Sequence, residues 1–343
     1  MVFLIAAVLV GLGLVLRVPV RGIGAMLAVL WAAVLLVHLL LPVDSALPRA
    51  IGGRAVHWVL LGAVVAIVLG YRAVLRHLRA RAVPVEAGAP ADTFSGAELE
   101  RYARHIVLRE IGGPGQKKLR QARVLVIGAG GLGSPVLLYL AAAGVGSVGI
   151  VDDDVVSNSN LQRQVIHTDA RIGMPKVFSA QAAMLALNPY ITVRPYHRRL
   201  AAEDAPALFA DYDLILDGTD NFATRYMVNA AAVAAGKPLI AGAIAQWEGQ
   251  LSLYDPARGA PCFACVFPEQ PAEGLAPSCA EAGVVGALPG IVGAMMAAEA
   301  IKEITGAGQT ARGRLMIHDA LWGESRQIAV KRRPGCAVCG KAG

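Results

Sequence analysis

The stretch Arg123-Val-Leu-Val-Ile-Gly-Ala-Gly-Gly-Leu-Gly133 decides the fold of this chain. Residues 123–127 form a short, largely apolar run, which is typical of a buried parallel strand. Residues 128–133 follow with the spacing G-x-G-x-x-G, and 134–143 continue as an apolar helix. A second apolar run then ends in three aspartates at 152–154. This order predicts a βαβ unit in an α/β fold with a Rossmann-like, mainly parallel sheet.

The same unit predicts a nucleotide site at the end of its first strand. Glycines allow the backbone to approach a phosphate closely, and the N-terminus of the following helix presents free N–H groups to an anion. An acidic side chain at the end of the second strand suits ribose hydroxyls. Alone, this pattern fits an NAD-dependent oxidoreductase equally well. The residues predicted here to contact the nucleotide are Gly128, Gly130, Gly131, Gly133, Asp152 and Asp154.

Polar and basic residues farther along favour an enzyme that cleaves a triphosphate. Arg163 and Lys176 can hold the β- and γ-phosphates and stabilise charge on departing pyrophosphate. Asp220 follows the apolar run 214–216 and is a good Mg²⁺ ligand at the carboxyl end of a strand. The alternative for Asp220 is a helix N-cap. The further residues predicted to contact the nucleotide are Ser159, Asn160, Leu161, Gln162 and Asn221.

The first 82 residues differ in character from the rest of the chain. Apolar runs lie at 2–16, 23–41 and 55–71, and a membrane span needs about 20 apolar residues. We therefore expect two or three transmembrane helices in 1–82, because the first run is short. A secretory signal is the alternative, but no basic segment precedes that run. Residues 83–95 are typical of a linker, which leaves 96–343 as the large domain.

Charge is unevenly divided between these parts. Residues 1–82 contain eight Arg and one acid, Asp44, so they carry 8 − 1 = +7, the whole formal net charge. The remaining 32 − 8 = 24 basic and 25 − 1 = 24 acidic residues cancel, so the large domain is not expected to bind nucleic acid. Arginines lie between the first two runs and after the third. This pattern predicts a multi-pass protein of the inner (cytoplasmic) membrane with its large domain in the cytoplasm.

Two C-x-x-C pairs predict a metal site in the large domain. Cys262, Cys265, Cys336 and Cys339 supply four thiolates, the ligand set of a closed, structural Zn²⁺ site. The alternative is two separate dithiols. A fifth thiol, Cys279, stands alone among small residues, where ordinary packing is one explanation.

The ordered motifs together resemble the family of molybdopterin-synthase adenylyltransferase and its thiamine-pathway relative, the MoeB/ThiF/HesA type. The resemblance runs from about residue 98 to Cys339 and covers the large domain. Relatives of this kind usually lack membrane spans, so the N-terminal segment is an addition. The motifs are both cysteine pairs, RYARHI at 101–106, GAGGLG at 128–133, DDDVVSNSNLQRQ at 152–164, GMPK at 173–176, DGTDN at 217–221 and SCAEAG at 278–283.

The resemblance implies that ATP and Mg²⁺ activate the C-terminal glycine carboxylate of a small ubiquitin-like sulfur-carrier protein as an acyl-adenylate. The small subunit of molybdopterin synthase is the expected carrier, and the thiamine-pathway carrier is the alternative. Within the site, the resemblance implies phosphate contacts from Asn160, Arg163 and Lys176 and a Mg²⁺ ligand in Asp220. Arg104 is implied to reach the ATP site of a partner subunit, so a homodimer is expected.

Further expectations concern the sulfur donor, Cys279 and the histidines. No sulfurtransferase domain follows Cys339, so the sulfur donor is expected to be a separate protein. Some relatives carry a thiol at the place of Cys279 that joins the carrier covalently, which is a second interpretation of that residue. His105, His167 and His318 are expected to be structural, because a carboxylate nucleophile is already ionised and needs no general base. The remaining alternatives are an NAD-dependent oxidoreductase and a non-enzymatic membrane scaffold.

Overall fold

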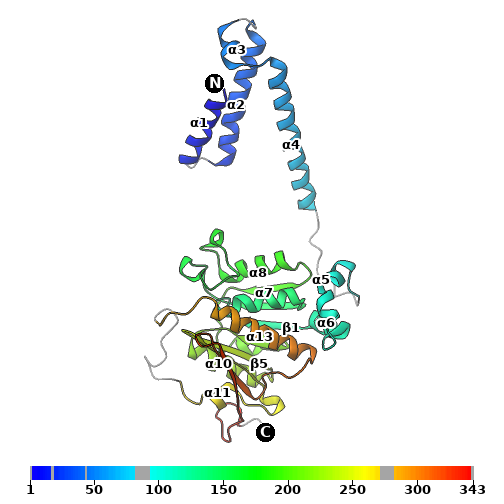
Figure 1. Ribbon diagram of the computed structural model, residues 1–343, viewed down its shortest axis with the longest axis vertical. Coiled ribbons are helices and arrows are strands. Elements are labelled where there is room, and N and C mark those ends of the chain that lie inside the picture. The colour runs from blue at the N-terminus through cyan, green and yellow to red at the C-terminus, as the bar shows by residue number, and fades with distance from the viewer. Residues whose placement is uncertain (1, 17–18, 43–44, 82–92, 271–281, 341–343) are drawn as a thin grey trace. The chain divides into compact units, whose positions relative to one another are not determined.

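The chain forms two compact units, Met1–Glu86 and Ala87–Gly343. Figure 1 shows the first as a group of helices and the second as a sheet with helices packed on it. The predicted linker, 83–95, lies almost entirely outside the described residues. The computed structural model describes residues 2–16, 19–42, 45–81, 93–270 and 282–340.

The described part of the N-terminal unit consists of helices joined by short turns. Helices α1 and α4 both pack against α2. Two stretches, Gly22–Leu40 and Ala55–Val74, are long and apolar enough to cross a membrane, judged by length and composition. Helix α1 is shorter, with 14 residues. The helices are α1 (Val2–Val15), α2 (Val20–Leu40), α3 (Ala46–Ile51) and α4 (Ala55–Arg81).

Two features of this unit differ from the sequence prediction. Helix α3 lies between the second and third predicted apolar runs, where no helix was predicted, and it runs from Ser45 at its N-cap to Gly52 at its C-cap. Helix α4 continues to Arg81, beyond the predicted end at Tyr71. The segment 72–81 is rich in Ala, Leu and Arg and contains no Gly or Pro, so nothing in it ends the helix.

The second unit is built on one sheet with the strand order β3-β2-β1-β4-β5-β6-β7-β8. The pairs from β3 to β5 are parallel, and the pairs from β5 to β8 are antiparallel. The predicted mainly parallel α/β sheet is confirmed, with an antiparallel part added at one edge. The strands are β1 (Arg123–Ile127), β2 (Ser147–Val151), β3 (Thr192–Tyr196), β4 (Leu214–Asp217), β5 (Leu239–Ala245), β6 (Glu248–Tyr254), β7 (Arg314–Asp319) and β8 (Glu324–Ala329).

Helices cover both faces of this sheet. Helices α7, α8 and α13 bury apolar residues in one core, and α9 and α10 bury theirs in the other. Figure 1 shows α7 beside α13, with which it packs. The helices of this unit are α5 (Gly96–Ile106), α6 (Gly112–Gln121), α7 (Gly133–Ala143), α8 (Lys176–Leu187), α9 (Ala205–Ala210), α10 (Phe222–Ala234), α11 (Phe263–Val266) and α13 (Leu288–Thr305).

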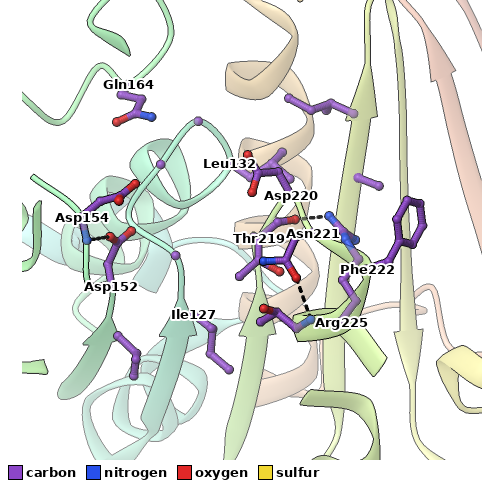
Figure 2. A pocket seen from close by; sticks show the side chains of 18 of the residues that line it. Ile127, Leu132, Asp152, Asp154, Gln164, Thr219, Asp220, Asn221, Phe222 and Arg225 are labelled. Atoms are coloured by element: carbon purple, nitrogen blue, oxygen red, sulfur yellow. Dashed lines mark hydrogen bonds between the residues drawn. The ribbon is translucent and has the colours of Figure 1, made fainter. Parts of the chain in front are cut away.

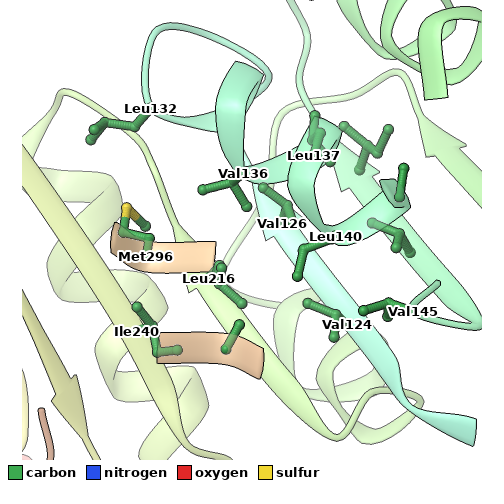
Figure 3. Close-up of a cluster of buried hydrophobic side chains, with 14 of the residues drawn as sticks. Val124, Val126, Leu132, Val136, Leu137, Leu140, Val145, Leu216, Ile240 and Met296 are labelled. Carbon is green, nitrogen blue, oxygen red and sulfur yellow. The ribbon is translucent and has the colours of Figure 1, made fainter. Parts of the chain in front are cut away.

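Strand β1 shows why this sheet is buried on both sides. Val124 and Val126 enter the core beneath α7 and α13, and Leu125 and Ile127 enter the opposite core. Successive side chains of a strand point to opposite faces, so an unbroken apolar run fits a central parallel strand. Figure 3 shows Val124 and Val126 in a cluster with Met296 of α13.

The loop between β1 and α7 depends on two of its glycines. Gly128 has a φ of 92°, in a region that side chains with a Cβ rarely adopt. A Cβ on Gly133 would lie 1.9 Å from the Gly128 carbonyl oxygen, so only glycine lets the helix begin this close to the strand. The motif therefore fixes a tight turn that leaves the start of α7 open toward the end of the sheet.

Candidate active site

A cavity of about 810 Å³ opens at the carboxyl ends of β1, β2 and β4. The chain runs outward from β1 in both directions, to β2 on one side and β4 on the other. Doubly wound sheets bind ligands at such a switch point. Figure 2 shows Ile127, Asp152 and Asp220 around this cavity. The predicted residues that line it are Gly128, Gly130, Gly131, Asp152, Asp154, Asn160, Arg163, Lys176, Asp220 and Asn221.

Several other predicted residues do not line the cavity. Arg104 is exposed on α5, and it makes no hydrogen bond or ion pair within the described ranges. Cys279 lies outside the described residues. The predicted nucleotide contacts that lie away from the cavity lining are Gly133, Ser159, Leu161 and Gln162.

The glycine loop is held at Ala129 from two sides. The Asp152 carboxylate accepts the Ala129 N–H at 2.8 Å and the Asp154 N–H at 2.8 Å. The ring of His167 lies 2.9 Å from the Ala129 carbonyl oxygen and 2.9 Å from the Ser179 hydroxyl. Burial lowers the pKa of His167, so the ring is neutral and donates to one partner while accepting from the other. This places His167 as a support of the loop rather than as a reacting group.

Asp152 keeps room for a ligand despite these bonds. Burial raises the pKa of its carboxyl group above the ordinary value, opposed by the Ala129 N–H bond and by Lys176. Helix α7 begins without a side-chain cap. Its Ser134 N–H is bonded to the Gly130 carbonyl oxygen, but the Gly133 N–H has no partner among the described residues and remains available to an anion. A carboxylate that can accept hydrogen bonds from ribose hydroxyl groups thus lies beside a helix N-terminus that attracts phosphate.

Two basic side chains approach the cavity from the segment after β2. The Lys176 Nζ is buried and lies 2.8 Å from Asp154 Oδ2. Arg163 donates to the Asn160 side-chain oxygen at 3.2 Å, and Gln164 donates to the same oxygen at 3.0 Å. The Gln164 Oε1 atom is buried and accepts no hydrogen bond from any described residue. Two cations at one cavity fit a phosphate ligand, and the unpaired Gln164 oxygen can accept a hydrogen bond from a donor group of a ligand.

Asp220 stands at the tip of the turn after β4. Asn221 is the N-cap of α10, and its side-chain oxygen accepts the Thr224 N–H at 2.7 Å. The helix-cap alternative for Asp220 is therefore wrong. The Asp220 carboxylate is exposed and has no hydrogen bond or ion pair among the described residues. It is free to bind a cation.

Sequence reasoning missed part of the cavity wall. Arg225 of α10 is 6% exposed and lines the cavity, as do Gln246 and Gln250 near the turn between β5 and β6. Phe263 and Phe267 complete that side. None of these residues belongs to a motif used above, although Arg225 follows DGTDN by four residues, one helical turn. That spacing was the only available signal.

The four paired cysteines converge, as the zinc prediction required. Their sulfur atoms lie within 4.8 Å of one another. The Sγ–Sγ distances are 3.8 Å for Cys262 and Cys265, 3.7 Å for Cys262 and Cys336, and 3.4 Å for Cys265 and Cys339. Tetrahedral zinc with Zn–S bonds of about 2.3 Å needs sulfurs about 3.8 Å apart. The set fits Zn²⁺, and the alternative of two separate dithiols is wrong.

Comparison with known proteins defines the family. Residues 102–338 match the model described as the ThiF family. The chain belongs to the ThiF family. Over 248 residues it is 54% identical to a Mycobacterium tuberculosis H37Rv protein named "Probable adenylyltransferase/sulfurtransferase MoeZ", covering 71% of this chain and 63% of that one. The ThiF-family chain thus spans less than two thirds of the mycobacterial protein's length.

A shorter relative matches over nearly its whole length. This is the Thermus thermophilus "Sulfur carrier protein adenylyltransferase", which is 49% identical over 247 residues, 71% of the ThiF-family chain and 91% of the relative. Among solved structures, the "Crystal structure of E. coli MccB + MccA-N7isoASN" has a TM-score of 0.64 at 23% identity and covers 70% of this chain and 75% of that one. At that identity the likeness shows the fold alone. The predicted family is confirmed, and the oxidoreductase alternative finds no support.

Proposed function

We propose that this ThiF-family protein uses ATP to adenylylate the C-terminal glycine carboxylate of a small ubiquitin-like sulfur-carrier protein. The observation that carries the proposal is the convergence of Arg163, Lys176 and Asp220 on one cavity beside the glycine loop. An enzyme that transfers hydride has no use for these three groups next to a ribose site. The name of the Thermus relative supports a sulfur carrier as the substrate.

The proposed reaction is attack by a carboxylate on the α-phosphorus of ATP. One carboxylate oxygen of the carrier forms a bond to this phosphorus, the bond to the oxygen that bridges to the β-phosphate breaks, and pyrophosphate leaves with the electron pair. No general base is needed, because a carboxylate is ionised at neutral pH. The chain supplies position and positive charge through the start of α7, Arg163 and Lys176.

Two metal ions belong to the proposal, in different roles. Asp220 would hold Mg²⁺, since its carboxylate lines the cavity, is exposed and has no partner among the described residues. Such an ion neutralises charge on the phosphates when it is bound. The four cysteines would hold Zn²⁺ in a closed set with no open position, so that ion would stabilise the fold and take no part in the chemistry.

The proposal includes a homodimer in which Arg104 serves the partner's site. In support, Arg104 is exposed, lies outside its own cavity and has no partner within the described part of the chain. An arginine that acts across a two-fold interface would look like this in a single subunit.

For the carrier, we propose the small subunit of molybdopterin synthase. The thiamine-pathway carrier also ends in Gly-Gly and presents the same chemistry, so it is the competing outcome of the test below.

We further propose that the N-terminal unit anchors the protein in the cytoplasmic membrane. Gly22–Leu40 and Ala55–Val74 support this, because most of their apolar side chains are exposed, Leu39 at 65% and Ile67 at 70% for example. The arginine-rich end of α4 favours the cytoplasm as the side of the large domain. Sedimentation of tagged protein with the membranes after carbonate washing tests the proposed membrane anchor, and release of the protein into the soluble fraction contradicts that anchor.

The test of the activity is ATP–pyrophosphate exchange by the full chain with each of the two carriers. We expect exchange that requires the carrier's terminal glycine, and a loss of about 100-fold or more in Asp220→Ala. Asp169→Ala, an exposed aspartate outside the cavity, is the matched control. Exchange that survives in Asp220→Ala, or none with either carrier, overturns the proposal; the non-enzymatic scaffold then becomes the better explanation.

A further inference from the structure

Arg225 is a buried cation at the edge of the cavity. Its residue is 6% exposed and it lines the cavity wall from the first turns of α10. A guanidinium group carries five N–H donors, and burying it is costly unless they find acceptors. Within the described residues its hydrogen bond goes to one acceptor, the Thr219 carbonyl oxygen. The charged side chain of Arg225 is thus hydrogen-bonded to a single backbone oxygen beside the cavity.

The bonded atom belongs to the turn that presents Asp220. Asp217 is 1% exposed, and its Oδ1 accepts the Thr219 N–H at 2.9 Å and the Thr219 hydroxyl at 2.7 Å. Arg225 holds the remaining polar group, the Thr219 carbonyl. Every hydrogen-bonding group of Thr219 is therefore fixed by a buried side chain.

This arrangement sets the direction in which Asp220 leaves the turn. The Thr219 carbonyl and the Asp220 N–H share one planar peptide group, so holding the carbonyl also holds the start of Asp220. Figure 2 shows Thr219, Asp220 and Arg225 grouped at this side of the cavity. Asp220 itself forms no bond with described residues, so its orientation depends on the rigidity of the residue before it.

Helix α10 is in turn anchored to the cysteine cluster. Asn229, one turn after Arg225, accepts the Phe263 N–H at 2.8 Å, and Phe263 directly follows a cluster cysteine. The Tyr226 hydroxyl donates to the Phe267 carbonyl at 2.9 Å. The helix that carries Arg225 is therefore fixed by the residues that directly follow Arg225.

We propose that Arg225 is a positioning residue that orients Asp220 for Mg²⁺ bound to ATP. This rests on the proposed function, in which Asp220 is the Mg²⁺ ligand. Arg225 acts through the Thr219 carbonyl and does not itself bind the ion. Residues that orient a metal ligand from behind typically contribute about 10-fold to 100-fold in metal affinity.

The test measures ATP affinity with and without Mg²⁺ by calorimetry on the full chain, which needs no carrier and no turnover. For Arg225→Gln we expect the gain in ATP affinity from Mg²⁺ to shrink by about 10-fold or more, with ATP affinity in excess EDTA within about 2-fold of the parent. The half-saturating Mg²⁺ concentration in pyrophosphate exchange should rise in parallel. Arg123→Gln is the control: it loses the 2.9 Å ion pair with Asp213 at the other end of β1 and should leave the Mg²⁺ effect unchanged.

A double variant separates positioning from general structural support. If Arg225 acts through Asp220, then Arg225→Gln should add less than about 3-fold to the Mg²⁺ effect in an Asp220→Asn background. An unchanged Mg²⁺ effect in Arg225→Gln, or an equal loss of affinity with and without the ion, overturns the inference. Should Arg225→Gln fail to fold, Arg225→Lys decides, because it keeps one donor and should show a smaller shift in the same direction; no shift overturns the inference.

Failure of the two proposals can be told apart. If the parent binds Mg²⁺–ATP but exchanges pyrophosphate with neither carrier, the proposed function fails while the Arg225 inference is still decided by calorimetry. If exchange occurs and the Mg²⁺ dependence of Arg225→Gln equals that of the parent, only the inference fails.

Discussion

The cavity and the cysteine cluster gather polar side chains in opposite ways. In the cavity, Asp220 is exposed and unpartnered, and Gln164 keeps a buried oxygen without a hydrogen bond among the described residues. In the cluster, the sulfurs face one another within 4.8 Å, and Cys262, Cys336 and Cys339 are at most 2% exposed. One site leaves bonding capacity for a ligand, and the other closes on itself.

This difference separates chemistry from stability in one domain. A closed set of ligands can hold an ion but offers no position to a substrate, whereas open groups bind substrate and contribute little to folding. Substitutions at the cluster should therefore change unfolding, and substitutions at the cavity should change catalysis. The following experiments test that division, beginning with the largest expected effect.

Removing metal from the cluster should affect stability most. Structural zinc sites contribute about 10 kcal/mol or more to folding, so a strong chelator, or Cys339→Ser, should abolish the cooperative unfolding transition of the large domain. Circular dichroism on heating measures it, and added Zn²⁺ after chelation should restore the transition. An unfolding curve unaffected by chelation contradicts the cluster's structural role.

Lys176→Met should affect catalysis and leave the fold nearly unchanged. Loss of a charge that stabilises departing pyrophosphate is expected to slow exchange by about 100-fold to 1,000-fold. Its partner Asp154 has a side chain that is 70% exposed and stays hydrated after the change. Exchange rate and thermal midpoint are measured together, with Lys237→Met, a half-buried lysine outside the cavity, as control. A large fall in the midpoint with normal exchange would reverse the division.

Mixing two inactive variants tests whether the cavity is complete in one subunit. If Arg104 serves the partner's site, Arg104→Ala and Asp220→Ala subunits should form mixed dimers with one intact site. Random mixing puts half the chains in mixed dimers, so about a quarter of the parent activity should return. Lys176→Met mixed with Asp220→Ala is the control and should stay inactive, since both defects lie in their own subunit's site. No recovery in the first mixture contradicts the shared site.

The smallest effect should come from His167, which links the cavity to stability. Its pKa is lowered in the folded protein from 6.5, so the unfolded chain binds a proton first as the pH falls. Stability should therefore fall as the pH drops through about 6.5 toward the lower folded pKa, by less than about 1.4 kcal/mol per pH unit. Urea unfolding between pH 8 and pH 5 measures this, and His167→Gln should remove that part of the slope. The exposed His197→Gln should retain it, and equal slopes in parent and His167→Gln contradict the assignment.

Local patterns in the chain were enough to predict much of the fold. The run 123–127 became β1 because apolar side chains on both faces of a strand need two cores. The roles of Gly128 and Gly133 could be predicted because no other residue fits the turn that they form. Helix α3 and the last turns of α4 were missed, since short or polar helices lack the apolar period on which such predictions depend.

The sequence alone determined the glycine loop, the acids after β2 and the cysteine pairs, because each is a short motif with its own spacing. Together these motifs determined the family. Tertiary structure decided what those motifs meet. It made Asn221 rather than Asp220 the cap of α10, brought Arg225 to the carbonyl of Thr219, and closed four distant sulfurs into one site. The bonds of Asn221 and Arg225 lie within one turn of the chain, where neighbouring polar residues compete for the same groups and the folded geometry decides between them. The two cysteine pairs, 74 residues apart, meet only because the packing of the domain brings them together.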